Sequence, residues 1–309
     1  MRCTIVIPTY NTSALLGQCL RALLSDLASR PDVEVVVSDD GSADGTGALL
    51  DRLNGAVAVV RSPVNRGFAH ACNAGAEAAS GAAYVFYNTD LTPRHGWLDA
   101  LLDYAETGSR PALVGTRLLF PDGRLQHCGA EICADGFPRH VYAGFPGDHP
   151  VAMRSGPAHI VTGACMLVRA DAFAALGGFD TGYRNGYEDV DLCLRARQAG
   201  DEVHYCHRSV LNHLVSATRE HRRAEFARSE QRFVDRWGHL PPTDFARYRA
   251  DGLLTVDYGP AYPLRLMVSP ELALVEQADV RGEDPRLLLH ALRRENVRLR
   301  MQLGGNLED

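Results

Sequence analysis

The chain of 309 residues contains no lysine, so all 32 of its basic residues are arginine. No lysine amine can therefore form a Schiff base with a carbonyl substrate, and none can serve in a lysine-containing phosphate loop. This absence argues against aldolases, pyridoxal-phosphate enzymes and P-loop proteins.

An excess of positive charge is also lacking, because the formal net charge is -6. Nucleic-acid binding normally needs a basic patch, so we expect no nucleic-acid partner. The negative charge would not attract an anionic ligand either. Such a ligand would have to be held by a metal ion, by backbone N–H groups or by single arginines.

The eight cysteines are scattered and form no C-x-x-C pair. This spacing fits neither a zinc site nor a disulfide framework. No apolar run approaches the roughly 18 residues that span a bilayer. The chain begins with a strand-like run rather than a signal peptide. We expect a protein of the reducing cytoplasm, free or peripheral to the inner face of the membrane.

β-Branched runs alternate with helical patterns over the first 90 residues. The expected strands are 3–8, 33–37, 57–61 and 83–87, and the helices between them are about 15–24, 45–53 and 68–79. This alternation predicts an α/β fold with a mostly parallel, nucleotide-binding sheet flanked by helices.

The middle of the chain is less regular. Residues 121–157 are rich in Gly, Pro and His, and we expect loops and a short hairpin there. A strand over 160–169 includes Gly163, where backbone could approach a ligand. An amphipathic helix over 187–200 has an acidic start and a closing glycine. Two short strands, 203–206 and 210–214, follow it.

The character of the sequence changes after about residue 215. We expect a charged helix over 219–236, an irregular stretch over 240–263 and an Arg- and Leu-rich helix over 286–303. The last helix would pack on the core or pair with a second copy, giving a homodimer. The predicted division is therefore a catalytic unit, 1–215, followed by a mainly helical C-terminal extension, 216–309.

Polar clusters follow three of the predicted strands. They are Thr9-Tyr10, Asp39-Asp40 and Asn88–Asp90. Each cluster alone is typical of a capped turn. Ligands of such sheets bind at the carboxyl ends of the strands, so three clusters at one edge indicate a binding site. The catalytic unit then divides into a nucleotide-binding half, 1–95, and an acceptor-side half, 96–215.

Two residues are candidate metal ligands. Asp90 offers the carboxylate oxygen that a hard divalent cation prefers. Manganese also accepts imidazole, so His213 is either a second ligand or a structural histidine. We expect Mn²⁺ or Mg²⁺ as the cofactor.

The acidic helix start is the candidate for general base. Glu188 and Asp189 could simply cap the helix, because its free N–H groups favour anions. Three acids in four residues exceed what a cap needs, so we expect Asp189 to act as base, with Glu188 and Asp191 in support. Asp191 could instead pair with Arg195, four residues further on.

Taken in order, these segments resemble family 2 glycosyltransferases with the A-type nucleotide-sugar transferase fold. The matching pieces are TIVIPTYN, VVVSDDGSADGT, NRGFAHACNAG, YNTD, TGACMLVR, GGFD, YEDVDLCLRARQAG and His213, over about residues 3–215. PDGRLQHCG at 121–129 is similar to the bacterial branch that builds O-antigens and rhamnans.

The resemblance implies an inverting transfer of a sugar from a nucleotide-diphosphate donor to an acceptor hydroxyl. The acceptor would be a glycan, a lipid-linked glycan, a protein or a small metabolite. The residues it implies are Thr9, Tyr10 and Asp40 at the nucleoside base, Asn88 and Asp90 in the D-x-D metal motif, His213 at the metal, and Asp189 as base. We also expect Asn65, Gly67 and Asn88 to bind the donor. Gly163, Asp191 and Arg195 would bind the acceptor or support the site.

The sequence departs from the family pattern in two motifs, and these departures bear on the metal site and on the number of sugars transferred. Asn88 replaces the first Asp of the metal motif. The Q-x-x-R-W motif of processive synthases is absent, because Gln231 and Arg236-Trp237 are too far apart, so we expect one sugar per acceptor. A nucleotidyltransferase would need a Gly-rich basic loop where PTYNTS stands. A non-catalytic binding protein would not need the intact acidic pair.

Overall fold

The computed structural model describes residues 2–53, 55–214, 223–257 and 265–272. The helix expected over 286–303, and with it the proposed homodimer contact, lies outside these residues. Within the described ranges, no helix is long and apolar enough to cross a bilayer.

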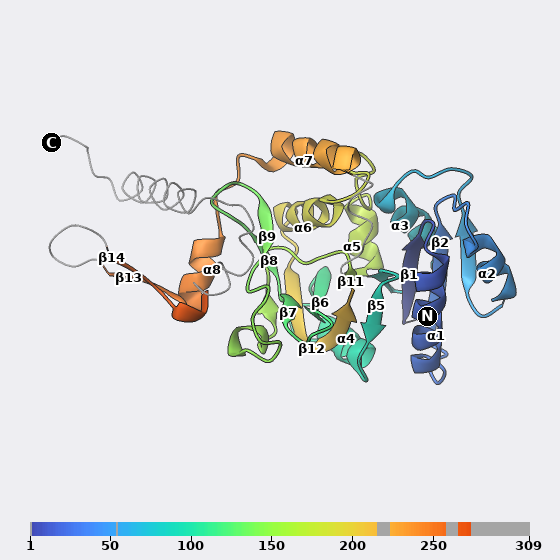
Figure 1. The fold of residues 1–309 in the computed structure, drawn as a ribbon, viewed down its shortest axis with the longest axis horizontal. Helices are drawn as coiled ribbons and strands as arrows, with labels where there is room; N and C mark the ends of the chain where they lie inside the picture. The colour runs from blue at the N-terminus through green and yellow to red at the C-terminus, as the bar shows by residue number, and fades with distance from the viewer. Residues whose placement is uncertain (1, 54, 215–222, 258–264, 273–309) are drawn as a thin grey trace.

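The first part of the chain alternates strands and helices as expected (Figure 1). The elements are β1 (Cys3–Thr9), α1 (Ser13–Asp26), β2 (Val33–Asp39), α2 (Thr46–Arg52), β3 (Ala58–Arg61), α3 (Phe68–Glu77), β4 (Ala83–Tyr87), β5 (Leu91–Pro93), α4 (Trp97–Glu106) and β6 (Leu113–Leu119).

The second part begins with short strands and ends with helices and a hairpin. Its elements are β7 (Leu125–His127), β8 (Ala130–Ile132), β9 (Pro138–His140), the 3₁₀ turn η1 (Pro150–Ala152), β10 (Gly156–Pro157), β11 (Cys165–Arg169), α5 (Ala170–Ala175), α6 (Glu188–Gln198), β12 (Val203–His213), α7 (Arg223–Trp237), α8 (Asp244–Ala250), β13 (Leu254–Asp257) and β14 (Arg265–Val268).

One central sheet organises the molecule. Its strand order is β10-β12-β6-β11-β4-β1-β2-β3, and β5 and β7 pair with β12 and β6. The pairs β3/β2, β2/β1, β1/β4 and β12/β6 are parallel, whereas β11 runs antiparallel to both of its neighbours. The first four strands therefore end at the same edge, as the polar clusters required.

Helices cover both faces of this sheet, so strand residues on both faces are buried. Along β1, Ile5 and Ile7 belong to one core cluster and Val6 to the other. Helices α1 and α4 pack on the Ile5 face. Helices α3, α5, α6 and α7 contribute to the cluster on the Val6 face, where α7 lies above α6 at the top of Figure 1.

Three boundary predictions were wrong. The strand expected over 160–169 begins only at Cys165, because residues 162–164 form a turn. The two strands expected over 203–214 are one strand, β12, with a shift of register between Cys206 and Val210. The stretch 240–263 contains α8 and β13 rather than irregular chain.

The described part of the C-terminal extension shares the core of the first part. Phe233 and Trp237 of α7, together with Leu253 and Leu272, are buried in the same cluster as Val6 and Phe86. This shared core shows no boundary between the two predicted parts. The division at residue 215 therefore stays a prediction.

Candidate active site

Three strand ends open into one cavity. The carboxyl ends of β1, β2 and β4 bring the three polar clusters together there, beside α3. The lining residues are Pro8, Thr9, Tyr10, Thr12, Leu15, Asp40, Asn65, Gly67, Phe68, Ala71, Asn88, Thr89, Asp90 and Asn185. Six of them are predicted donor-binding residues and one is the predicted metal ligand Asp90.

The Asp40 carboxylate fixes the part of the cavity wall beside the end of β1. It is buried and accepts hydrogen bonds from the backbone N–H of Arg66, at 2.9 Å, and of Gly67, at 2.7 Å. These bonds tie the end of β2 to the loop before α3. Asp40 therefore shapes the cavity through the 65–67 loop, and its own contact with a nucleoside base stays a prediction.

The 65–67 loop also touches the segment before α6. Arg184 donates from its guanidinium to the carbonyl oxygen of Asn65, at 2.9 Å, and its own carbonyl accepts the N–H of Phe68, at 2.8 Å. Gly67 has φ +100°, and a Cβ there would lie 2.4 Å from the Arg184 oxygen. Only glycine fits, so the loop can close against residue 184.

The predicted metal ligands lie side by side. Asp90 Oδ1 and His213 Nε2 are 3.1 Å apart, and both side chains are largely buried. The strand pairing explains this contact, because β5 directly follows Asp90 and pairs with β12 at Leu91 and His213. The Leu214 N–H also donates to the Asp90 carbonyl, at 3.0 Å.

This pair suits a divalent cation. Within the described residues, no cluster of three or more Asp, Glu, His or Cys side chains could enclose a metal. A carboxylate oxygen at the cavity and an imidazole nitrogen beside it leave coordination positions for diphosphate oxygens and waters, as Mg²⁺ and Mn²⁺ sites at phosphates usually do. The donor set therefore fits, although metal binding stays a prediction.

The three acids of α6 differ in access. Glu188 and Asp191 are buried, whereas Asp189 is partly accessible. Asp189 Oδ2 accepts the N–H of Gly163 at 2.7 Å, and a Cβ at Gly163 would approach the Asp189 Cβ to 3.1 Å. Gly163 thus allows the backbone to lie directly against the partly accessible carboxylate of Asp189.

The turn 162–164 joins the base to the metal side. Gly163 donates to Asp189, and the carbonyl of Ala164 accepts the N–H of Asn88 at 2.9 Å. On the other side of the turn, Thr162 donates its N–H to Nε2 of the buried His127, at 3.3 Å. Asp189 and the metal motif are therefore linked through one short turn.

The buried thiol of Cys72 lies near carboxylates from both sides of the site. Burial raises the pKa of Cys72 on α3 well above its usual value, and the nearby charges of Glu188, Asp189 and Asp40 raise it further. Asp40 directly follows β2, whereas Glu188 and Asp189 begin α6, so the thiol lies near acids from both segments.

The carboxyl group of Glu188 is buried, and the described residues leave one of its two oxygens without a hydrogen-bond partner. Burial, followed by the Asp189 charge, raises its pKa to about 8. Its Oε2 is buried without a hydrogen-bond partner among the described residues. The residue before it, Tyr187, has φ +70°, which is unfavourable for a non-glycine residue. Strain and an unpaired acid at the same point are typical of functional sites.

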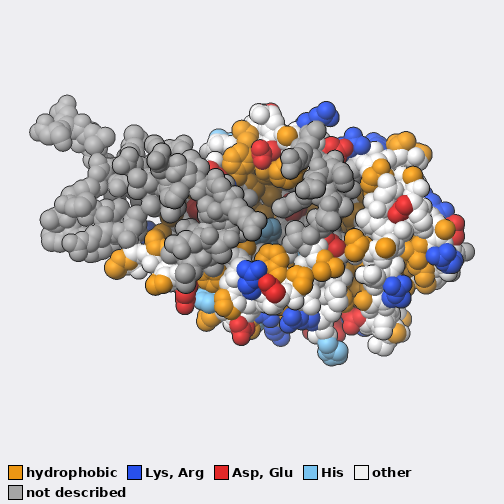
Figure 2. Space-filling model, in the orientation of Figure 1, with side chains coloured by type: hydrophobic (Ala, Val, Ile, Leu, Met, Phe, Trp, Pro, Cys, Tyr) orange, Lys and Arg blue, Asp and Glu red, His pale blue; other side chains and the backbone are white. Residues whose placement is uncertain are grey.

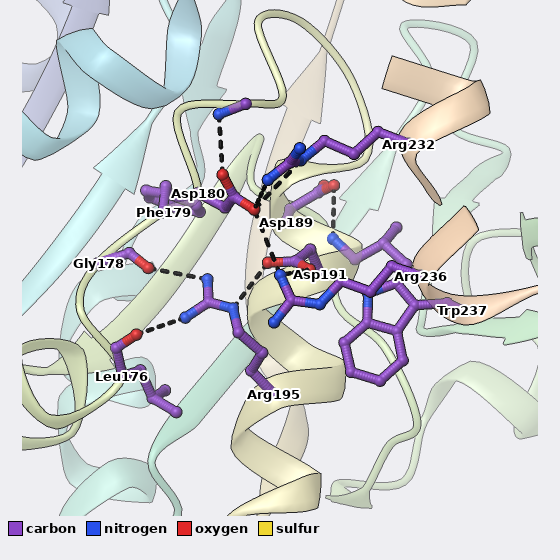
Figure 3. A network of polar contacts seen from close by, with 12 residues as sticks. Leu176, Gly178, Phe179, Asp180, Asp189, Asp191, Arg195, Arg232, Arg236 and Trp237 are labelled. Carbon is purple, nitrogen blue, oxygen red and sulfur yellow. Dashed lines mark hydrogen bonds and ion pairs between the residues drawn. The ribbon is translucent and has the colours of Figure 1, made fainter. Parts of the chain in front are cut away.

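Asp191 and Arg195 are structural supports. Asp191 is completely buried and binds Arg195 Nε at 2.7 Å, confirming the four-residue pairing (Figure 3). Arg195 also donates to the carbonyls of Leu176 and Gly178. Both side chains are occupied in joining α6 to the 176–178 turn, so neither faces the cavity as an acceptor ligand.

Sequence reasoning missed Asn185, Gln126 and His127. Asn185 lines the cavity. Gln126 contacts His213 and His127 contacts Thr162. The signal for the last two was present, because both lie in the PDGRLQHCG segment that we used only as a sign of kinship.

Solved glycosyltransferases share this fold. The mannosyltransferase PcManGT from Pyrobaculum calidifontis, in complex with GDP-Man and Mn²⁺, aligns with TM-score 0.55 at 20% identity, over 97% of this chain and 80% of that one. GalNAc-T7 with UDP, GalNAc and Mn²⁺ aligns with TM-score 0.57 at 17% identity, over 69% of this chain and 44% of that one. The architecture is thus that of the A-type glycosyltransferases.

The model of the family named Glycosyl transferase family 2 matches residues 4–177, more than half of the chain. The chain therefore belongs to glycosyl transferase family 2, and the resemblance found in the sequence is confirmed.

The chain is also similar in sequence to curated proteins. The O-antigen biosynthesis protein RfbC of Myxococcus xanthus is 31% identical over 228 residues, covering 70% of this chain and 17% of RfbC. The N-acetylglucosaminyl-diphospho-decaprenol L-rhamnosyltransferase of Mycobacterium tuberculosis is 28% identical over 237 residues, covering 69% of this chain and 76% of that protein. The chain spans 27%, 17% and 40% of the lengths of the first three curated relatives that it matches.

Proposed function

We propose that this chain is an inverting, non-processive glycosyltransferase that uses a nucleotide-diphosphate sugar. The observation that carries the proposal is the position of Asp189. Its carboxylate is the accessible one on α6, is held by the Gly163 N–H, and is linked by the 162–164 turn to Asn88 in the donor cavity.

The donor would lie in the cavity at the strand ends. Its nucleoside would contact Thr9, Tyr10 and Asp40, and its diphosphate would lie near Asn88 and Asp90, with Asn65 and Gly67 along the wall. Acidic and arginine side chains are interspersed over the described part of the face in Figure 2, so local groups rather than a broad positive field would bind the phosphates.

Asp90 and His213 would hold a divalent cation there. That cation would neutralise charge on the departing diphosphate. Arg184 lies beside the cavity wall, where its guanidinium donates to the Asn65 carbonyl and forms an ion pair with Glu225 at 3.0 Å. It would place a second cationic group near the donor.

Asp189 would act on the acceptor. Its carboxylate accepts the proton of the acceptor hydroxyl while that oxygen forms a bond to the anomeric carbon. The bond from this carbon to the diphosphate oxygen breaks, and the nucleoside diphosphate leaves with the electron pair. Attack opposite the leaving group inverts the anomeric centre. Burial of Glu188 and Asp191 leaves Asp189 to take the proton.

The acceptor class follows from kinship alone. One relative is named for rhamnosyl transfer to a diphospho-decaprenol carrier and another for O-antigen biosynthesis. We therefore propose a lipid-linked saccharide as the first acceptor to test. Proteins, free glycans and small metabolites are the other classes.

A donor screen tests the proposed function. UDP-, GDP- and dTDP-sugars would be added to the full chain with Mn²⁺ or Mg²⁺, and the melting temperature and the release of nucleoside diphosphate would be measured. We expect one nucleotide to raise the melting temperature by mass action and its sugar to be released or transferred. Absence of binding to every donor would contradict the proposal, and binding without turnover would indicate a non-catalytic relative.

A further inference from the structure

Gln126 makes two hydrogen bonds to a single residue, His213. It lies in the short strand β7, between Leu125 and His127, and is buried. Its amide Nε2 donates to the His213 carbonyl at 3.3 Å, and its Oε1 lies 2.6 Å from His213 Nδ1. Gln126 thus forms hydrogen bonds with both the backbone and the ring of the proposed metal ligand, His213.

The carbonyl of His213 determines how this amide faces. A backbone carbonyl can only accept a hydrogen bond, so the NH₂ of Gln126 must face it. The Gln126 oxygen then faces the ring, and an amide oxygen can only accept. His213 Nδ1 must therefore carry a proton and donate it to Gln126.

The other ring nitrogen faces Asp90. When the imidazole is neutral, the proton on Nδ1 leaves the lone pair of Nε2 facing Asp90 Oδ1, 3.1 Å away. These two acceptors repel unless a positive charge, either a metal ion beside them or a proton on Nε2, compensates the contact. The arrangement is the one that a ligating histidine needs, with Nε2 free to bind and Nδ1–H held from behind.

We propose that Gln126 is a positioning residue for the metal pair and fixes His213 in the tautomer that can bind a divalent cation. The inference rests on the metal site of the proposed function. It assigns a role to Gln126, which neither the donor cavity nor the turn at the base uses.

The side-chain chemistry explains why glutamine stands here. The role needs a donor for the carbonyl and an acceptor for Nδ1–H at the end of one stem. Glutamate supplies only acceptors when ionised, leucine supplies neither, and asparagine is shorter by one methylene. Glutamate can still accept from Nδ1–H, whereas leucine cannot.

The test measures Mn²⁺ binding to the full chain, with Mn²⁺ alone and with UDP, GDP or dTDP, by the electron paramagnetic resonance signal of free Mn²⁺. Gln126→Leu, which keeps the side-chain volume, is expected to raise the Mn²⁺ dissociation constant by about 10- to 100-fold, as loss of such an orienting partner does. It should approach His213→Ala. Gln126→Glu should bind more tightly than Gln126→Leu.

Gln231→Leu is the matched control. Gln231 is exposed on α7 and donates to Asp235 at 2.8 Å, so the same substitution there should leave Mn²⁺ binding at the wild-type value. Circular dichroism and melting temperature establish that each variant is folded. Nitrogen-15 spectra of the metal-free imidazoles, assigned by loss of the His213→Ala signal, should show Nδ1–H in the wild type and a change of tautomer in Gln126→Leu.

The outcomes separate this inference from the proposed function. If His213→Ala weakens Mn²⁺ binding and Gln126→Leu does not, Gln126 has no positioning role. If neither variant changes binding, or the wild type binds no Mn²⁺, the metal pair is wrong as well and the inference falls with it. If Gln126→Leu weakens binding but no donor is used by the wild type, the inference stands and the proposed function fails.

Discussion

The indole N–H of Trp237 donates to Asp191 Oδ1 at 2.9 Å, which joins the last turn of α7 to the first turn of α6 (Figure 3). Asp191 also binds Arg236, at 3.1 Å, while Arg232 and Arg236 both contact Asp180. Helix α7 therefore braces the helix that presents Asp189, two residues before Asp191.

A second set of contacts supports the same point. The ring of Tyr187 stacks on Phe233 with centroids 5.0 Å apart, and its hydroxyl donates to Glu230 at 2.9 Å. Tyr187 has the unfavourable positive φ directly before Glu188. Both partners belong to α7, so this helix holds the strained residue at the start of α6 in place.

Trp237→Phe should weaken this brace. Loss of a hydrogen bond to a buried carboxylate costs about 1–3 kcal/mol, so the melting temperature should fall. Because Asp189 is less well fixed, kcat should fall while the donor dissociation constant stays unchanged. Calorimetry and steady-state kinetics check this expectation.

Trp97→Phe is the matched control for Trp237→Phe. Trp97 is likewise buried and donates to an aspartate, Asp26, at 2.9 Å, but it lies in the core cluster on the other face of the sheet. It should lower the melting temperature without lowering kcat. Equal effects of the two variants on kcat would refute a positioning role for Trp237.

Asp189→Asn should abolish transfer and retain donor binding. The amide oxygen can still accept the Gly163 N–H, but an amide cannot take the acceptor proton. General-base catalysis contributes about 10²- to 10⁴-fold, so kcat should fall by that factor. Asp171→Asn, at the first turn of α5, should leave kcat intact. Normal turnover by Asp189→Asn would remove Asp189 as the base.

Asp90→Ala should uncouple donor binding from metal. In the wild type, a chelator should reduce the rise in melting temperature that the donor causes. In Asp90→Ala that rise should already be small and should not change with chelator. The expectation fails if the variant binds the donor as the wild type does, both with Mn²⁺ and with chelator.

Gly163→Ala should misplace the base. The added Cβ would stand 3.1 Å from the Asp189 Cβ, closer than most such contacts, so α6 or the turn must shift. We expect a lower kcat and a smaller change in donor affinity, because Gly163 itself contacts the base, whereas the turn reaches the cavity lining only through the bond from the Asn88 N–H to the Ala164 carbonyl. Gly156→Ala, in β10, meets nothing within 4 Å and serves as the control. Wild-type kcat in Gly163→Ala would show that the close contact is unimportant.

The strand ends and the short-range pair were predictable from sequence. A parallel sheet brings Thr9, Asp40 and Asn88 to one edge whatever the loops do. The Asp191–Arg195 pair follows from helical spacing alone. Neither prediction depends on the path of the irregular segments.

The missed contacts depend on those irregular segments. Gln126 reaches His213 only because β7 pairs with β6 across an irregular register, which no periodicity between residues 121 and 157 reveals. Trp237 reaches Asp191 across 46 residues of chain. In the sequence, Trp237 shows only that the Q-x-x-R-W motif is absent, and no local pattern connects its indole to the acidic helix.

Glu188→Gln should change the dependence of stability on pH. The pKa of Glu188 is raised from 4.5 to about 8, so between these values the folded chain keeps a proton that the unfolded chain releases. This group therefore lowers the free energy of unfolding as pH rises, by at most about 1.4 kcal/mol per pH unit. Below pH 4.5 both states are protonated, and above pH 8 the loss is complete.

Glutamine has no proton to release, so the melting temperature of Glu188→Gln relative to wild type should increase from pH 5 to pH 8. Glu77→Gln, on the exposed side of α3, should show a difference that does not change with pH. The same flat difference for Glu188→Gln would mean that Glu188 is ionised in the folded chain at pH 5. Its negative charge would then have to be compensated by a ligand or a cation, because an uncompensated buried carboxylate beside Asp189 is too costly to persist.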